Sequence, residues 1–266
     1  MDDGPRELFG HRPTDPESVP GSEGEVILAI KPTQRDPSRA TVRVGSSRLT
    51  AQGTPRRGRV VVTLYRSAIE ALGLSVGDAW DEAIAARLEA AGDEDKAFRA
   101  AANRLARRAM SAGMITQKLR ELGYAEAVRD AVLTRLDKMG LLDDASYGRA
   151  LIRETTRGKP AGERLLRQKL RAKWLDGTLI ERLLAEHREE REQQALQSGD
   201  DPNADAIAFA RKRAASMARL EPEVRRRRLY GQLARRGFDP DTIRRAMDAA
   251  LREAEPDLEA DFGDVD

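Results

Sequence analysis

The residues best suited to acid–base or metal chemistry are two adjacent carboxylates and two histidines. Asp143 and Asp144 could share a proton, and His11 and His187 could bind a metal ion. Neither set has partners at a catalytic or metal-binding spacing, and no phosphate-binding glycine loop is present. We therefore predict that Asp143 or Asp144 caps a helix. We predict no catalytic residue, metal site or cofactor.

Basic residues offer a different chemistry. On a helix expected over 161–174, Arg164, Arg167 and Arg171 recur at i, i+3 and i+7, opposite the apolar stripe. Lys169 and Lys173 add charge to the same helix. A helix of this length spans ~21 Å, so its basic face could meet several phosphates or carboxylates at once.

Similar basic faces recur on the other helices. Solvated helix faces usually mix the two signs of charge, whereas these are mostly positive, so we predict that they bind a partner. Arginine suits both DNA phosphates and the carboxylates of an acidic protein, and the pattern leaves that choice open. The remaining candidates for this surface are Arg104, Arg107, Arg108, Lys118, Arg120, Arg149, Arg153, Arg157, Arg225, Arg227, Arg228 and Arg235.

Four aromatic residues could stack on nucleic-acid bases: Tyr124, Tyr147, Trp174 and Phe238. Tyr124 and Phe238 share one position at a helix end, and Trp174 falls one residue earlier in its copy of the same pattern. We therefore predict that the group packs between helices.

The elements that must position these residues are repeated. Residues 118–124, 169–175 and 232–238 align, each with a leucine, then basic residues, then a large apolar side chain. The aligned leucines are 51 and 63 residues apart (170−119 and 233−170). Such repeats stack because one unit alone cannot bury its apolar face. We predict a mainly α fold of three tandem three-helix repeats in an elongated array, its curvature right- or left-handed.

Composition limits the class of protein. The net charge of +2 hides segregation, because residues 96–186 carry 20 basic against 11 acidic residues and residues 211–236 carry ten against two. Residues 1–25 carry seven acidic and two basic residues, and residues 253–266 seven acidic and none. This predicts a polyanionic or acidic partner. Without cysteine, signal peptide or an apolar run of ~20 residues, we predict a cytoplasmic protein that does not contact membranes.

The predicted domain organisation follows glycine, proline and charge signals. A small α+β N-terminal extension contains strands near 26–30, 40–44 and 59–65, a short helix at 67–73, and a helix from an Asp78 cap to about residue 90. Ser111 is the expected N-cap of a helix that stops at Gly123, and Gly140 and 158–160 end the helices before them. The predicted segments are a disordered acidic tail 1–24, the extension 25–92, repeats 93–140, 141–197 and 204–252, a linker 198–203 and an acidic tail 253–266.

Residues 97–251 resemble the RecX family, the regulatory proteins of the RecA recombinase, in several short sequence motifs and in the order and spacing of these motifs. They include Lys118-Leu119 with Gly123-Tyr124, the run 140–144 followed by Tyr147, and residues 236–238 before the last helix. The chain departs from the family pattern at Met110, Met114-Ile115, Lys169 and Trp174, the last of these in place of a glycine stop.

The resemblance implies tandem three-helix repeats, no enzymatic activity, and binding to the RecA–DNA filament that restrains recombination and filament growth. It places the protein in DNA repair and the SOS response. An alternative is a sequence-independent DNA-binding protein that competes for phosphates, single- or double-stranded. A third is an adaptor for another acidic protein. We expect a monomer.

Overall fold

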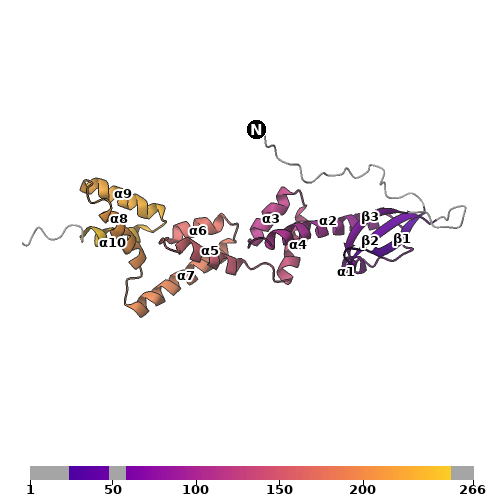
Figure 1. The fold of residues 1–266 in the computed structure, drawn as a ribbon, viewed down its shortest axis with the longest axis horizontal. Coiled ribbons are helices and arrows are strands. Elements are labelled where there is room, and N and C mark those ends of the chain that lie inside the picture. The colour runs from indigo at the N-terminus through magenta and orange to yellow at the C-terminus, as the bar shows by residue number, and fades with distance from the viewer. Residues whose placement is uncertain (1–23, 48–57, 253–266) are drawn as a thin grey trace, which may run out of the picture. The chain divides into compact units, whose positions relative to one another are not determined.

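The computed structural model describes residues 24–47 and 58–252 (Figure 1). Its strands are β1 (Glu25–Pro32), β2 (Arg39–Ser46) and β3 (Arg59–Tyr65). Its helices are α1 (Arg66–Ala71), α2 (Glu82–Leu105), α3 (Ala112–Glu121), α4 (Glu126–Lys138), α5 (Asp144–Thr156), α6 (Glu163–Arg171), α7 (Gly177–Ser198), α8 (Ala204–Ala215), α9 (Pro222–Arg235) and α10 (Pro240–Arg252). The predicted disorder of residues 1–23 and 253–266 concerns residues outside this description.

The strands form an antiparallel sheet in the order β1-β2-β3, as the β-branched runs predicted. Ala40, Val42 and Val44 are buried at every second position of β2, so this strand turns one face to the core. Ile27 and Leu64 complete the apolar face from the neighbouring strands.

A buried ion pair ties this sheet to α2. The Arg39 guanidinium lies 2.8 Å from the Asp95 carboxylate, and the side chains are only 12% and 6% exposed. Arg39 also donates to the Thr63 carbonyl at 2.8 Å and lies over the Tyr65 ring. Removing one partner of such a pair leaves an uncompensated buried charge, so loss of Arg39 or Asp95 would destabilise this contact between sheet and helix.

The helix predicted to start at Asp78 begins later and runs further. Asp78 instead accepts from the Ser75 amide at 2.8 Å, while Asp81 accepts from the Ile84 amide at 2.7 Å and starts α2. The helix then continues through Gly92 to Leu105, across the boundary expected at residues 92–93. A Cβ at Gly92 would lie 3.1 Å from Val62, so this glycine serves close packing on the sheet and is not a stop signal.

The other predicted helices are present within a few residues of the expected bounds, and the predicted caps of α3 and α5 are confirmed. Ser111 accepts from the Met114 amide at 3.1 Å and Asp143 accepts from the Ser146 amide at 2.8 Å. Gly123 and Gly140 follow their helices with φ values of 83° and 65°. These left-handed residues end each helix at no steric cost because glycine has no Cβ.

The helices α6 and α9 end in the same six-residue turn. After α9, Phe238 N–H donates to the Leu233 carbonyl and Gly237 N–H to the Ala234 carbonyl. After α6, Leu175 N–H donates to Leu170 and Trp174 N–H to Arg171. Trp174 therefore occupies the left-handed position of Gly237, with φ 58° against 79°.

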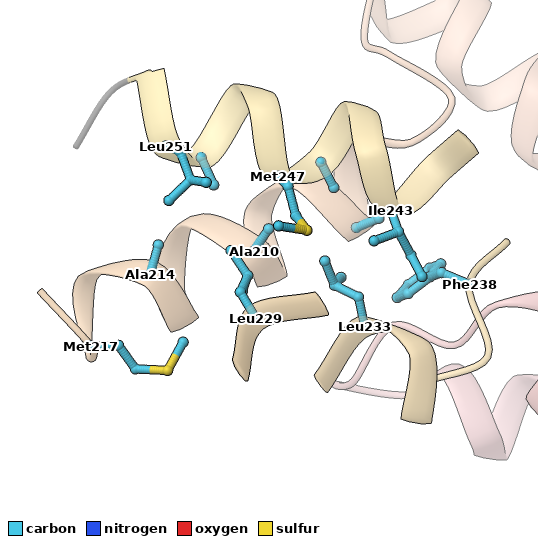
Figure 2. Close-up of a cluster of buried hydrophobic side chains, with 12 residues drawn as sticks. Ala210, Ala214, Met217, Leu229, Leu233, Phe238, Ile243, Met247 and Leu251 are labelled. Carbon is cyan, nitrogen blue, oxygen red and sulfur yellow. The ribbon is translucent and has the colours of Figure 1, made fainter. Parts of the chain in front are cut away.

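The third repeat buries its own core. Figure 2 shows Leu233 of α9, Phe238 of the following turn and Ile243 of α10 converging, with Ala210 of α8 and Met247 of α10 beside them. Small alanines on α8 let the helices approach closely. The second repeat has a separate core between α5, α6 and α7, centred on the buried Leu166, Leu170 and Leu183. None of the helices within the described ranges has the length and apolar composition of a membrane span.

Candidate partner-binding surface

The basic face predicted on α6 is largely open to solvent. Arg164, Lys169 and Arg171 are exposed, and within the described residues none of them forms an ion pair. Lys173, half-buried, follows the helix and has no carboxylate partner there either. These four cations are free to meet an external anion.

Arg167 has a different role from its neighbours on the same face. Its Nε and Nη2 donate to the two carboxylate oxygens of Glu181 on α7, both at 2.9 Å. Glu163 lies 3.8 Å away on the other side. The hydrogen bond to Glu181 raises the pKa of Arg167. This fork joins α6 to α7, so Arg167 is already neutralised within the fold.

The basic residues of the first repeat do not form one helical stripe. Because α2 ends at Leu105, Arg107 and Arg108 lie in the turn that leads to Ser111, where both are exposed. Arg104 is half-buried in the last turn of α2 and has partners of its own. On α3, Lys118 pairs with Glu121 at 2.6 Å, whereas Arg120 is exposed.

On α5, Arg149 donates to Glu186 of α7 at 3.0 Å, and this contact raises the pKa of Arg149. Arg153 and Arg157 are exposed, and in the described part of the chain no carboxylate pairs with them.

The basic run at the start of α9 is split by the helix. Arg225 is only 7% exposed and belongs to the interior, because it falls one turn before the buried Leu229. Arg227, Arg228 and Arg235 are exposed. The prediction that Arg225 belongs to the partner-binding surface is therefore wrong.

The repeats meet at two joints of the same design. In joint 1, the start of α3 receives the turn after α6. The Ser111 hydroxyl donates to the Lys173 carbonyl, and a Cβ at Gly113 would lie within 3.0 Å of the Trp174 carbonyl oxygen and Cβ. The glycine is required by this close approach. Asp144 accepts from the Ala112 amide at 2.8 Å and adds a second-repeat contact.

In joint 2, the start of α6 receives the turn after α9. Gly162 N–H donates to the Arg236 carbonyl at 2.9 Å, and Arg164 N–H donates to the Gly237 carbonyl at 3.1 Å. The Arg236 side chain reaches back to the Pro160 carbonyl at 2.7 Å. Burial, reinforced by the nearby Arg213, lowers the pKa of Arg236.

The joints bring together cations that are far apart in the sequence. Joint 1 places Lys173 beside Ser111, only three residues after the exposed Arg108. Joint 2 places Arg164 beside the turn that follows Arg235. Sequence spacing predicted the basic faces one helix at a time. Only the backbone contacts between repeats show which helix start meets which turn. In the sequence, the sole sign of these contacts is the glycine at positions 113 and 162, where a side chain would clash with the turn of the next repeat.

The remaining candidates have structural roles or stand alone. Asp143 caps α5, and its hydrogen bonds from the Ser146 amide and hydroxyl lower its pKa. Burial raises the pKa of Asp144. His187 lines a cavity of about 770 Å³ next to joint 2, and its Nε2 is buried without a hydrogen-bond partner among the described residues. No cluster of metal-binding side chains occurs in those same residues.

The aromatic residues divide by burial. Phe238 is buried, and Tyr124 and Tyr147 are half-buried. Trp174 is 57% exposed, so the prediction that it packs between helices is wrong. The next residue, Leu175, fills the interior position that Phe238 fills in the third repeat, and it leaves the indole outside.

The folding pattern and the sequence both match known proteins. Models of the first and third three-helix domains of RecX match residues 97–136 and 200–247. Regulatory protein RecX of Chlorobium phaeobacteroides is 32% identical over 160 residues, which are 60% of this chain and 97% of that protein. The chain belongs to the RecX family. Regulatory protein RecX of Prosthecochloris aestuarii is 35% identical over 159 residues, 60% of this chain and 96% of its own.

The RecX fold extends over more of the chain than the sequence match does. A crystal structure of regulatory protein RecX covers 84% of this chain and 99% of its own, with a TM-score of 0.64 at 20% identity. The predicted fold class, three-helix domains behind a small N-terminal sheet, is therefore confirmed. The resemblance inferred from residues 97–251 is confirmed as well.

Proposed function

We propose that this RecX-family protein binds the RecA–DNA filament and restrains its recombinase, ATPase and coprotease activities without catalysing a reaction. The observation that carries the proposal, beside family membership, is the set of exposed cations on all three repeats that lack a carboxylate partner among the described residues. A nucleoprotein filament offers both phosphates and protein carboxylates along its length. An extended basic surface therefore suits it better than it suits a small ligand.

In this proposal the repeats lie along the filament and bridge adjacent RecA protomers. Occupying that surface excludes duplex DNA, a coprotease target or the next RecA subunit. No active site is needed, because a regulator that binds one filament state more tightly than another shifts the population toward that state. The bidentate geometry of arginine serves such contacts with either phosphate or carboxylate.

The proposal predicts a loss of filament binding in a variant with Arg164→Ala, Lys169→Ala and Arg171→Ala. These three side chains are exposed and form no ion pair within the described ranges, whereas Arg167 is left in place because it joins α6 to α7. We expect filament affinity to fall about tenfold, which corresponds to roughly 1.4 kcal/mol. Sedimentation or fluorescence anisotropy with preformed filaments measures it.

The matched control removes the same charge from elsewhere: Arg66→Ala, Arg182→Ala and Arg244→Ala. Each of these exposed arginines has a carboxylate within 4.0 Å, at 3.8, 3.8 and 2.6 Å, and the one beside Arg182, Glu186, also accepts from Arg149. Binding should change less than twofold. An equal loss in both variants would mean that net charge alone matters, and no loss in the α6 variant would rule out α6 as the surface.

The functional test is RecA ATPase on preformed filaments, with single-stranded DNA in excess and this protein well below the number of DNA sites. A drop in ATP turnover is expected if the protein acts on the filament. Masking of DNA could not cause it, because the protein is too scarce to cover the DNA sites. The same exposed cations support a second function, DNA binding by phosphate competition. That function predicts unchanged turnover here and a steep loss of DNA binding between about 50 and 200 mM salt.

A further inference from the structure

We propose that Trp174 is a base-stacking residue that gives this protein a direct site for single-stranded nucleic acid at joint 1. The inference goes beyond both functions proposed above because it assigns the recognition of unpaired bases to one residue. It starts from the conformation of one side chain. Trp174 has φ 58° and is the one non-glycine residue with positive φ in the described ranges, where the equivalent Gly123 and Gly237 stand in the sister repeats.

Nothing in the fold of α6 requires a tryptophan at this position. A glycine ends a helix here without strain, and a bulky side chain with positive φ is a costly exception. The interior position is already filled by Leu175, which is 6% exposed, while Trp174 is 57% exposed. Strain at an exposed residue that supports no core is the kind of feature found at binding sites.

Joint 1 fixes the backbone and the Cβ of Trp174. The Trp174 backbone and Cβ pack against Gly113, and the preceding Lys173 carbonyl accepts from the buried Ser111 hydroxyl. Joint 1 therefore anchors the base of the side chain while its ring remains accessible. A rigidly placed aromatic ring loses little conformational freedom when a ligand stacks on it.

The surroundings select an anion with an aromatic face. Lys169, Arg171 and Lys173 precede the indole, and the exposed Arg107 and Arg108 lie four and three residues before Ser111, whose hydroxyl donates across the joint to the Lys173 carbonyl. Within the described residues none of these five cations forms an ion pair.

The carboxylates nearest to these cations along the chain already accept hydrogen bonds from backbone amides. Asp176 accepts from the Thr178 and Leu179 amides, at 2.8 and 3.2 Å, and Asp144 accepts from the Ala112 amide. Exposed cations in both segments that meet at joint 1, together with one exposed indole, match a phosphate backbone with unpaired bases. Duplex DNA would present the phosphates but not the base faces.

The experiment uses the full chain with Trp80→Phe, which leaves Trp174 as the sole tryptophan of the two. Trp80 is buried in the N-terminal core, so this background removes the second source of tryptophan fluorescence. Titration with oligo(dT) should quench the Trp174 fluorescence at saturation. A duplex with the same number of phosphates should give little quenching.

The matched variants, made in the wild-type background, are Trp174→Gly and Trp174→Tyr. Glycine suits the left-handed backbone, so Trp174→Gly should keep or raise the thermal midpoint while it weakens oligo(dT) binding roughly fivefold or more. Tyrosine keeps a stacking ring and should bind within about twofold of the wild type, as measured by anisotropy of labelled DNA.

Equal affinity of the glycine variant and wild type for oligo(dT), or saturation without quenching, would overturn the proposal. Quenching by RecA filaments but not by oligo(dT) would also overturn it and assign Trp174 to a protein contact. Unchanged RecA ATPase on addition of this protein would contradict only the proposed function, because the oligo(dT) titration contains no RecA, so the two failures are distinguishable.

Discussion

Joint 1 and joint 2 are built on the same backbone plan but use different chemistry. In both, the start of one middle helix receives the turn that ends the middle helix of the next repeat. Joint 2 is made by backbone groups, with two amides donating to the Arg236 and Gly237 carbonyls. Joint 1 substitutes a serine hydroxyl for a backbone donor and a tryptophan for the turn glycine. The comparison shows that two repeats can pack on the same backbone plan while one joint carries an exposed side chain, the Trp174 indole, where the other has a glycine.

The largest expected effect comes from adding a methyl group to the turn of joint 2. In Gly237→Ala the new Cβ would lie within 3.0 Å of the Leu165 backbone, and the residue would also hold a positive φ. Overpacking and left-handed strain together should cost about 3 kcal/mol. Hydrogen exchange of the Gly162 and Arg164 amides, which donate across this joint, should speed up accordingly.

The control for that variant is Gly123→Ala at the same repeat position. Gly123 has φ 83°, but among the described residues no atom lies within 4 Å of the place that the new methyl group would take. Only the backbone strain of about 1 kcal/mol therefore applies. Equal effects of the two substitutions would show that joint 2 yields easily and that strain alone matters.

A smaller effect is expected from Ser111→Ala in joint 1. The hydroxyl caps α3 and donates to Lys173, and the residue is fully buried, so its loss should destabilise the protein by about 1–2 kcal/mol. Urea unfolding followed by circular dichroism measures this. Ser216→Ala, which removes an exposed hydroxyl bound to the Arg213 carbonyl, should change stability far less.

Trp174→Gly should act in the opposite direction from the other joint variants. Removing a side chain from a left-handed residue relieves strain, so we expect a gain in stability of about 1 kcal/mol. The thermal midpoint should rise. A fall would mean that the indole packs usefully on joint 1 and that the two joints differ in stability as well as in chemistry.

The smallest effect concerns pH at joint 2. Burial lowers the pKa of His187, with Arg191 adding to the effect and Glu190, Glu163 and Asp205 opposing it. Below the ordinary histidine pKa of about 6.5 the unfolded chain binds a proton that the folded chain resists, so stability is lost as pH falls. His187→Gln should reduce the change of the thermal midpoint with pH between about pH 5 and 7. If the thermal midpoint of the variant changed with pH as much as that of the wild type, other titrating groups would control the pH dependence of stability.

Much of the fold could be predicted from local signals. Ser111, Asp143, Gly123 and Gly140 mark helix ends because capping depends on residues next to each other in the chain. The start of α2 was misplaced because Asp78 and Asp81 are equally good caps by type. The path of the chain on the sheet decides that Asp78 closes a turn and Asp81 starts the helix.

The candidate surface was predictable only in part. Helical spacing identified which cations share a face, and most of them are exposed. It could not show that Arg167 is held by Glu181, fourteen residues away. The inward position of Arg225, in contrast, follows from helical spacing, because Arg225 lies four residues before the buried Leu229. Ion pairing between helices depends on which helix faces pack together, and this cannot be derived from the sequence of one helix alone.

The sequence by itself determined the repeats, their caps and their excess of positive charge, since each depends on composition or on residues a few positions apart. Tertiary structure decided which cations remain unpaired and how neighbouring basic faces adjoin at Gly113 and Gly162. It also decided that Leu175 rather than Trp174 fills the core. The left-handed turn after α6 rotates one of two adjacent apolar side chains inward and the other outward, and only packing chooses between them.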